Sequence, residues 1–255
     1  MGRVFAVADL HGMIELYQQI KDFLKPEDKV YCLGDMGDRG TDCWETIKAI
    51  MNDSQFICLK GNHEDLLVNA MQVWLGTPSD EREFIWGVFE CCALARNGGR
   101  ETLEGWAKEP LKERKEWYKR IAKLPTHIEY KNKNDKWIYM SHAGFTPYSH
   151  NVFPDDEHLM WDRDHFMYSW PHDAPTDVII LHGHTPIQYL IEERYRFSRE
   201  IKPIPTFPCA YWYSGTHKCC IDNGSFYEFC TVLLDLDTFE EHKFYTLDYK
   251  GGKNG

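Results

Sequence analysis

Gly34-Asp35-Met36-Gly37-Asp38-Arg39-Gly40 is the stretch around which the chain is organised. It follows the apolar run Val30–Leu33, a pattern typical of a buried strand that ends in a glycine-rich loop. Two carboxylates and a guanidinium at the end of a buried strand are costly to desolvate unless they have partners. Divalent metal ions and a bound phosphate would be suitable partners. A solvated turn with a local Asp38–Arg39 ion pair is the alternative that this stretch alone leaves open.

Two further strand ends repeat this arrangement. The apolar run 3–8 ends in Asp9 and His11, and the run 55–59 ends in Asn62 and His63. Helical spacing over 13–24 and 42–51 separates the three runs, which predicts successive βα units. Open α/β sheets build their sites at the carboxyl ends of such strands. Because all three polar loops follow the carboxyl ends of strands, a single functional site is favoured over three unrelated turns.

The later part of the chain adds a helical block and more strands. Strands at 136–140 and 177–181 end in His142 and in the pair His182 and His184. Helices are expected over 64–75, 80–96, 99–108 and 111–123, and further strands over 217–222, 227–235 and 242–248. We expect one domain over 1–250, with the helical block 64–125 inserted as a cap on one side of the sheet, and a flexible tail over 251–255.

The composition excludes several classes of protein. No apolar run approaches the length of a membrane span, and the N-terminus leads directly into a strand, so we expect a cytoplasmic protein with no membrane partner. A net charge of −11 argues against nucleic acid as a partner. The 9 cysteines lie mostly in apolar runs, which is typical of reduced core residues. A structural zinc site near Cys209 to Cys220 is a weaker alternative.

The polar residues at the strand ends suit metal binding. Carboxylate, imidazole and amide ligands fit borderline divalent ions, with manganese our first expectation and iron or zinc as alternatives. The absence of cysteine from this set argues against a closed structural zinc site. Because there are too many donors for one tetrahedral ion and a carboxylate can bridge two ions, we expect a two-metal centre.

The motifs, in their order along the chain, resemble a known family. They are Asp9-x-His11-Gly12, Gly34-Asp35-x-x-Asp38-Arg39-Gly40, Gly61-Asn62-His63-Glu64, His142-Ala143-Gly144 and Gly183-His184-Thr185, with Arg96-Asn97-Gly98-Gly99, Met160-Trp161-Asp162-Arg163 and Ile221-Asp222-Asn223-Gly224 as further matches. This set is similar to the phosphoprotein phosphatase (calcineurin-like) metallophosphatases, and closest to the lambda-type protein phosphatases of bacteria and phages. The resemblance implies a four-layer α/β/β/α sandwich with a helical cap.

The resemblance also implies a role for each residue. Asp9, His11 and Asp35 would bind the first metal, and Asp35 would bridge to a second metal held by Asn62, His142 and His184. His63 would be the general acid, oriented by Asp38. Arg39 and Arg163 would bind the phosphate, because a guanidinium can hold two phosphate oxygens at once.

Three functions are compatible with this pattern, of which two are hydrolases built on the same centre and the third belongs to another class. The first is a phosphomonoesterase that hydrolyses phosphoserine and phosphothreonine, with phosphotyrosine and aryl phosphates as further substrates, by in-line attack of a metal-bridging hydroxide. The alternative is a hydrolase of dinucleoside polyphosphates or other small phosphate compounds, in which aromatic residues of 145–170 would stack a base. An inactive binding module of the same fold is disfavoured, since the acid and phosphate-binding positions are intact.

Four features leave questions for the structure. Gly37 stands where the family usually has an apolar residue, so the loop is expected to be looser or to make room for substrate. We expect His182 to be structural or to support the metal ligands from behind. We expect Glu64 to have no chemical role and to form a salt bridge or occupy the first turn of a helix. The connection 186–220, which shows no clear structure in the sequence, is either a lid over the site or a segment whose aromatic residues pack on the sheet.

Overall fold

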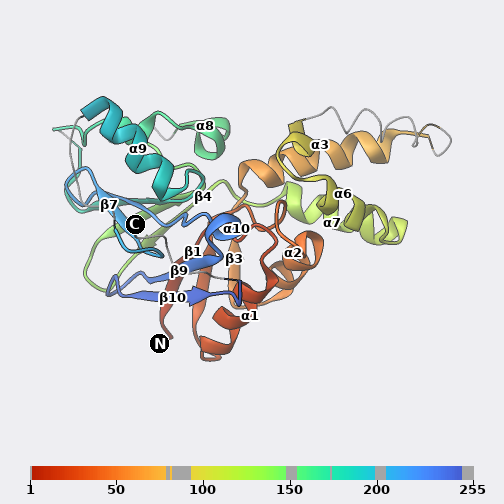
Figure 1. The fold of residues 1–255 in the computed structure, drawn as a ribbon, viewed down its shortest axis with the longest axis horizontal. Coiled ribbons are helices and arrows are strands. Elements are labelled where there is room, and N and C mark those ends of the chain that lie inside the picture. The colour runs from red at the N-terminus through yellow and green to blue at the C-terminus, as the bar shows by residue number, and fades with distance from the viewer. Residues whose placement is uncertain are drawn as a thin grey trace.

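Two five-stranded sheets form the centre of the molecule (Figure 1). The computed structural model describes residues 2–78, 81, 93–147, 154–172, 174–198 and 205–248. The first sheet has the order β10-β9-β1-β2-β3, with β1 (Val4–Val7), β2 (Lys29–Cys32), β3 (Phe56–Cys58), β9 (Cys230–Asp235) and β10 (Glu241–Tyr245). The second has the order β4-β5-β6-β8-β7, with β4 (His127–Lys131), β5 (Trp137–Ser141), β6 (Val178–His182), β7 (Tyr211–Tyr213) and β8 (Lys218–Cys220).

Each sheet has a parallel centre. Strands β1, β2 and β3 are parallel, and β9 joins β1 antiparallel. In the second sheet β5, β6 and β8 are parallel, while β4 and β7 pair antiparallel at the two edges. Because the parallel strands within each sheet share one direction, their carboxyl ends meet at a common edge, where the polar motifs lie.

Alternation along β1 shows how the layers pack. Phe5 and Val7 join a core with the helices α1 (Ile14–Phe23) and α2 (Cys43–Asn52), whereas Ala6 and Ala8 face the second sheet. On its other face the second sheet packs against α8 (Asp156–Trp161) and α9 (Ile187–Ser198). The order of layers is thus α/β/β/α, which confirms the fold expected from the sequence.

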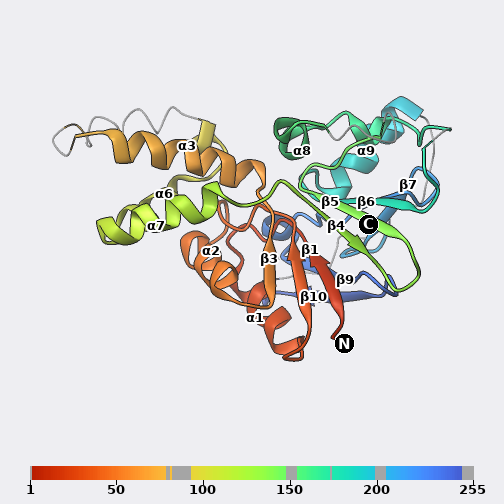
Figure 2. The same cartoon turned by 180° about the vertical axis from the view of Figure 1, so that it is seen from behind.

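The helical block lies to one side of the sandwich. Helices α3 (Asn62–Gly76), α6 (Arg100–Ala107) and α7 (Leu111–Ala122) project away from the sheets in both views (Figures 1 and 2). Trp106 is fully buried against Trp74, and this pair joins α6 to α3. Of the helix expected over 80–96, the described residues show α5 (Ala93–Arg96), and most of the rest falls outside the described part of the chain.

Several elements differ from the sequence-based expectation. The connection 186–220 contains the helix α9 and the strand β7, so it is not a structureless loop. The hairpin strand β4 was not expected, because its residues alternate between exposed and half-buried at a sheet edge and give a weak apolar pattern. The helix α10 (Ser225–Glu228) replaces the first residues of the strand expected over 227–235.

The tail 251–255 lies outside the described residues. No described helix has both the length and the apolar character that crossing a membrane requires. One domain over 1–250 with an inserted cap stays a prediction.

Candidate metal centre

Five loops from the two sheets converge on one buried cluster of polar side chains. Asp9 and His11 follow β1, Asp35 and Asp38 follow β2, and Asn62 and His63 begin α3. His142 follows β5 and His184 follows β6, so the second sheet supplies the opposite side of the cluster. All eight are buried. The structure therefore brings together every metal-ligand position predicted from the sequence.

Asp35 lies at the centre of this cluster. Its Oδ2 is 3.6 Å from His11 Nε2 and 3.7 Å from His63 Nε2. Its Oδ1 is 3.4 Å from His142 Nε2 on the other side. Oδ2 thus faces two histidines and Oδ1 faces a third on the other side, as expected of a carboxylate that bridges two ions.

Two groups of side chains have the ligand atoms and spacing to hold a metal ion. One is His11, Asp35 and His63, and the other is Asp9, Asp35 and His142; the ligand atoms of each group lie within 4.8 Å of one another. Because both groups contain Asp35, the arrangement is consistent with a dinuclear centre. Neither group contains a cysteine, so the zinc site considered near Cys209 to Cys220 finds no support among the described residues.

Asn62 and His184 extend the second group. Asn62 Oδ1 lies 2.8 Å from His142 Nε2 and 3.0 Å from His184 Nδ1. The orientation of His142 is fixed from behind, since its Nδ1–H donates to the carbonyl of Leu33 at 2.8 Å. Three potential metal-ligand atoms, of the types that divalent ions prefer, therefore point toward one another.

The electrostatics of the site favour a bound cation. Burial raises the pKa of the Asp9 carboxyl well above its usual range, and the neighbouring Asp222 raises it further. Burial also raises the pKa of Asp222, to about 6. Buried carboxylates that repel one another in this way are stabilised as anions by a nearby positive charge. The donor set and its charge thus fit divalent metal ions.

His63 and Asp38 form a close pair beside this cluster. His63 Nδ1–H donates to Asp38 Oδ2 at 2.6 Å. Burial lowers the pKa of His63, but Asp35 and Asp38 outweigh burial and raise it above its ordinary value. A histidine held in this way keeps its proton more readily, which suits a general acid.

The two arginines occupy different positions. Arg39 Nη1 lies 3.1 Å from His11 Nε2, and Arg39 Nη2 lies 2.8 Å from His63 Nε2. Arg163 is exposed, and its Nε–H donates to His184 Nε2 at 3.1 Å. Both guanidinium groups therefore border the cluster, one beside each group of ligands.

The backbone at these positions is strained. Asp9, Asp35 and Asp38 have φ angles of 54°, 53° and 64°, in the left-handed region that side chains rarely adopt. His11, Arg39 and His184 lie in the same region. Each such residue costs about 1–3 kcal/mol, and such strain concentrates at functional sites, where the surrounding structure enforces it.

Three further residues support the cluster; sequence reasoning missed two of them and expected the third, Glu64, to form a salt bridge or to lie in the first turn of a helix, where it is found. Glu64, to which we assigned no chemical role, accepts backbone N–H bonds from Asp35, Met36 and Gly61 at 2.8–2.9 Å, so it ties two loops together. Ser225 donates to the carbonyl of Asp9. Thr102 contacts Asp38 through its hydroxyl. The Glu64 contact had a signal, since a glutamate in the first turn of a helix can cap it; the other two had none.

Gly37 does not loosen the loop. A Cβ at this position would lie 2.6 Å from Ile47 Cδ1, so the side chain of Ile47 occupies the space that we expected to be free for substrate. The carbonyl of Gly37 accepts a hydrogen bond from His11 Nδ1 at 3.1 Å. The glycine thus permits close packing of the loop on α2 and helps to orient His11.

His182 and the connection 186–220 belong to the packing behind the site. His182 Nε2 lies 2.6 Å from the hydroxyl of Tyr213, and burial lowers the pKa of His182 to about 3. Helix α9 and the strand residues Tyr211 and Tyr213 share a core cluster. The described part of this connection therefore matches the alternative in which its aromatic residues pack on the sheet.

The aromatic stretch over 145–170 is only partly available for stacking. Phe145 and Phe166 are buried, and Trp170 stacks on His217. Trp161 and Tyr168 are exposed, whereas Tyr148 and Phe153 lie outside the described residues.

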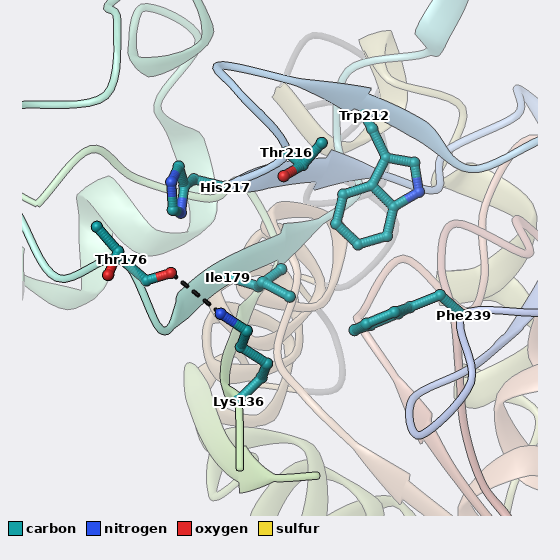
Figure 3. Close-up of a pocket in the computed structure, with 7 residues that line it drawn as sticks. All are labelled: Lys136, Thr176, Ile179, Trp212, Thr216, His217 and Phe239. Atoms are coloured by element: carbon teal, nitrogen blue, oxygen red, sulfur yellow. Dashed lines mark hydrogen bonds between the residues drawn. The ribbon is translucent and has the colours of Figure 1, made fainter. Parts of the chain in front are cut away.

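A cavity of about 370 Å³ lies elsewhere on the second sheet (Figure 3). Trp212 and Phe239 form one wall, Ile179 lies beneath, and His217 stands opposite. Its residues come from the amino end of β6, from β7 and from turns, whereas the polar cluster follows the carboxyl ends of the strands. This cavity is therefore no part of the candidate metal centre.

Comparison with known proteins gives one family and several similar folds. A family model described as calcineurin-like phosphoesterase matches residues 2–215. A search among curated proteins finds no match. Among solved structures, a provisionally named diadenosine tetraphosphatase has a TM-score of 0.59 at 13% identity, covering 97% of this chain and 95% of its own.

Two other solved structures have the same fold at similarly low sequence identity. A metallophosphoesterase from Sphaerobacter thermophilus has a TM-score of 0.50 at 13% identity, covering 96% of this chain and 88% of its own. A point mutant of a cold-active protein tyrosine phosphatase has a TM-score of 0.53 at 14% identity, covering 96% of this chain and 78% of its own. At these identities the three likenesses establish the fold alone.

Proposed function

Because this chain belongs to the calcineurin-like phosphoesterase family and is a metal-dependent hydrolase of phosphoric ester bonds, we propose that it acts on phosphate monoesters of serine and threonine side chains. Phosphotyrosine and aryl phosphates are further substrates in this proposal. It places the chain with the lambda-type protein phosphatases, acting in the cytoplasm with manganese as the preferred metal.

The pairing of His63 with Asp38 is the observation that carries this choice. Hydrolysis of an alkyl phosphate ester expels an alkoxide, which needs a proton in the transition state. Hydrolysis of a phosphate anhydride, as in a dinucleoside polyphosphate, expels a phosphate that is already a stable anion. A buried histidine whose pKa is raised by Asp35 and Asp38 therefore serves the ester more than the anhydride.

The other residues take the roles that the sequence predicts. Asp9, His11, Asp35, Asn62, His142 and His184 would hold two divalent ions, which supply Lewis-acid activation of water and neutralise phosphate charge when bound. Arg39 and Arg163 would bind the non-bridging phosphate oxygens on opposite sides of the cluster. Asp38 would hold His63 in the orientation that points Nε2 toward the leaving oxygen.

A substrate panel tests this proposal. Peptides with phosphoserine, phosphothreonine and phosphotyrosine, an aryl phosphate and diadenosine tetraphosphate are compared in the presence of manganese, iron or zinc. We expect the highest kcat/KM with the phosphoserine and phosphothreonine peptides. A higher kcat/KM with diadenosine tetraphosphate would indicate a hydrolase of phosphate anhydrides instead. If the metal-loaded protein hydrolyses none of these substrates, both enzyme functions are wrong and the binding module is the remaining alternative.

His63→Asn tests the acid itself. We expect kcat on phosphoserine peptides to fall by about 10²–10⁴-fold, as for the loss of a general acid. His172→Asn, at an exposed position, is the matched control and should retain activity. A small effect of His63→Asn on these substrates would contradict the proposed role.

A further inference from the structure

The segment Asn97–Thr102, which links α5 to α6 and includes the first residues of α6, contacts the proposed acid pair and the nearest arginine. We propose that Thr102 is a positioning residue that fixes the carboxylate of Asp38, and through it the ring of His63, during proton transfer to the leaving oxygen. This inference rests on the proposed function of His63.

One hydroxyl holds Asp38 at two points. The Thr102 Oγ1–H donates to Asp38 Oδ1, and the same oxygen accepts the backbone N–H of Asp38 at 3.1 Å. Asp38 Oδ2 then remains for His63 Nδ1–H. Thr102 is completely buried, with 0% of its surface exposed, so water does not compete for these bonds. The carboxylate is thereby prevented from rotating away from His63.

The neighbouring glycines bring the segment close enough for these contacts. A Cβ at Gly99 would lie 2.8 Å from Asp38 Oδ2, and one at Gly98 would lie 2.9 Å from Arg39 Cγ. Gly98 also has a φ of +84°, which favours glycine. The two glycines therefore allow the segment to lie directly against Asp38 and Arg39.

The same segment holds Arg39. The backbone N–H of Arg39 donates to the carbonyl of Gly98 at 3.1 Å, and its Nε–H donates to the carbonyl of Asn97 at 3.3 Å. Asp38 and Arg39 both have left-handed backbone angles, 64° and 69°. We infer that the contacts of this segment keep the two strained residues in place, so the helical block contributes to the orientation of the catalytic loop.

Thr102→Val tests this role, because valine has nearly the same shape and lacks only the hydroxyl. We expect kcat on a phosphothreonine peptide to fall by about 10–100-fold, since misplacing an acid reduces proton transfer to a poor leaving group. On p-nitrophenyl phosphate, whose leaving group needs little protonation, the fall should be below about threefold. Thr102→Ser, which keeps the hydroxyl, should restore most of the activity on the peptide.

The matched control is Thr46→Val. Thr46 is also completely buried, and its hydroxyl donates to the backbone carbonyl of Asp42 away from the acid pair. It should keep activity on both substrates. Should Thr102→Val fail to fold, Thr102→Ala removes the same hydroxyl and takes its place. Metal content is measured for each variant and should equal that of the wild type.

The outcomes separate this inference from the proposed function. Suppose that the loss of kcat in His63→Asn depends on the leaving group, but Thr102→Val loses no more activity than Thr46→Val. The positioning role of Thr102 is then wrong, and the assignment of His63 as the acid is retained. Equal losses on both substrates without rescue by serine would also overturn the positioning role, since they indicate a structural role. If His63→Asn shows no dependence on the leaving group, the acid assignment itself fails.

Discussion

The backbone N–H of His63 donates a hydrogen bond to Asp35 Oδ1, 3.0 Å away, although the two residues follow different strands. The proposed acid and the carboxylate shared by both ligand groups are thus tied to each other directly. Any change at Asp35 is therefore expected to disturb both metal binding and the position of His63.

Asp35→Asn is expected to lose metal from both groups, because Asp35 belongs to each of them and an amide is a poor bridging ligand. Elemental analysis of the purified variant after equilibration with manganese measures this loss directly. Asp135→Asn, at a position exposed on the surface, is the control and should bind metal as the wild type does. Near-wild-type metal content in Asp35→Asn would contradict the bridging assignment.

Arg39→Lys is expected to weaken inhibition by inorganic phosphate by about tenfold. A lysine keeps the positive charge but loses the planar pair of donors that now reach His11 and His63 and that would grip two phosphate oxygens. The inhibition constant is measured with an aryl phosphate substrate. Arg100→Lys, at an exposed position that pairs with Glu104, serves for comparison. An equal effect of both substitutions would contradict the assignment of Arg39 to the phosphate site.

Gly34→Ala is expected to destabilise the protein by at least about 1–3 kcal/mol. Gly34 has a φ of +94°, and an added Cβ would lie 2.5 Å from the backbone nitrogen of Gly61. Gly76→Ala is the matched control, since Gly76 ends α3 with no atom within 4 Å of the new Cβ, and it should stabilise by up to about 1 kcal/mol. Urea unfolding of the two variants should shift the midpoint in opposite directions.

His165 is expected to make the metal-free protein less stable as the pH falls. Burial lowers the pKa of His165 well below its ordinary value, so the folded protein keeps this ring neutral while the unfolded chain takes up a proton near pH 6.5. Stability from this group is then present above pH 6.5 and is lost as the pH falls toward the folded pKa. The loss is at most about 1.4 kcal/mol for each pH unit below 6.5.

Urea unfolding of chelator-treated protein at pH 7 and pH 5 measures this loss. His165→Leu should show a smaller decrease in the free energy of unfolding than the wild type, because leucine has no proton to gain. Leucine loses the bond between the ring and the backbone of Ala143, but His165 Nδ1 has no hydrogen-bond partner within the described residues that would be left unpaired. His172→Leu, at an exposed site, is the control; an unchanged decrease in His165→Leu would show that other groups cause it.

Much of the site could be predicted because each of its polar motifs lies within a few residues of an apolar strand. Each ligand motif follows its own apolar strand within a few residues, as Asp9 and His11 do after β1. Strand and helix patterns at the same places fix the βα order, and parallel strands then bring their carboxyl ends together. The convergence of Asp9, Asp35 and Asn62 was therefore predictable without coordinates, whereas His142 joins them because the second sheet packs on the first.

Other elements escaped prediction because their local signals are weak. Strand β4 is half-exposed, β7 is short, and the helix α9 lies in a segment rich in aromatic residues that also occur in strands. In each case packing on the second sheet decides the conformation. Local propensity alone leaves such segments ambiguous.

The sequence by itself determined the order of βα units and the candidate ligand and acid residues at their ends, since both depend on short-range patterns of polarity. Only the tertiary structure decided that Ile47 fills the space beside Gly37 and that Thr102 holds Asp38. Thr102 and Asp38 are 64 positions apart, and their contact exists because the helical block folds back onto the loop after β2. The distance between two such segments depends on how whole elements pack, which no local pattern encodes.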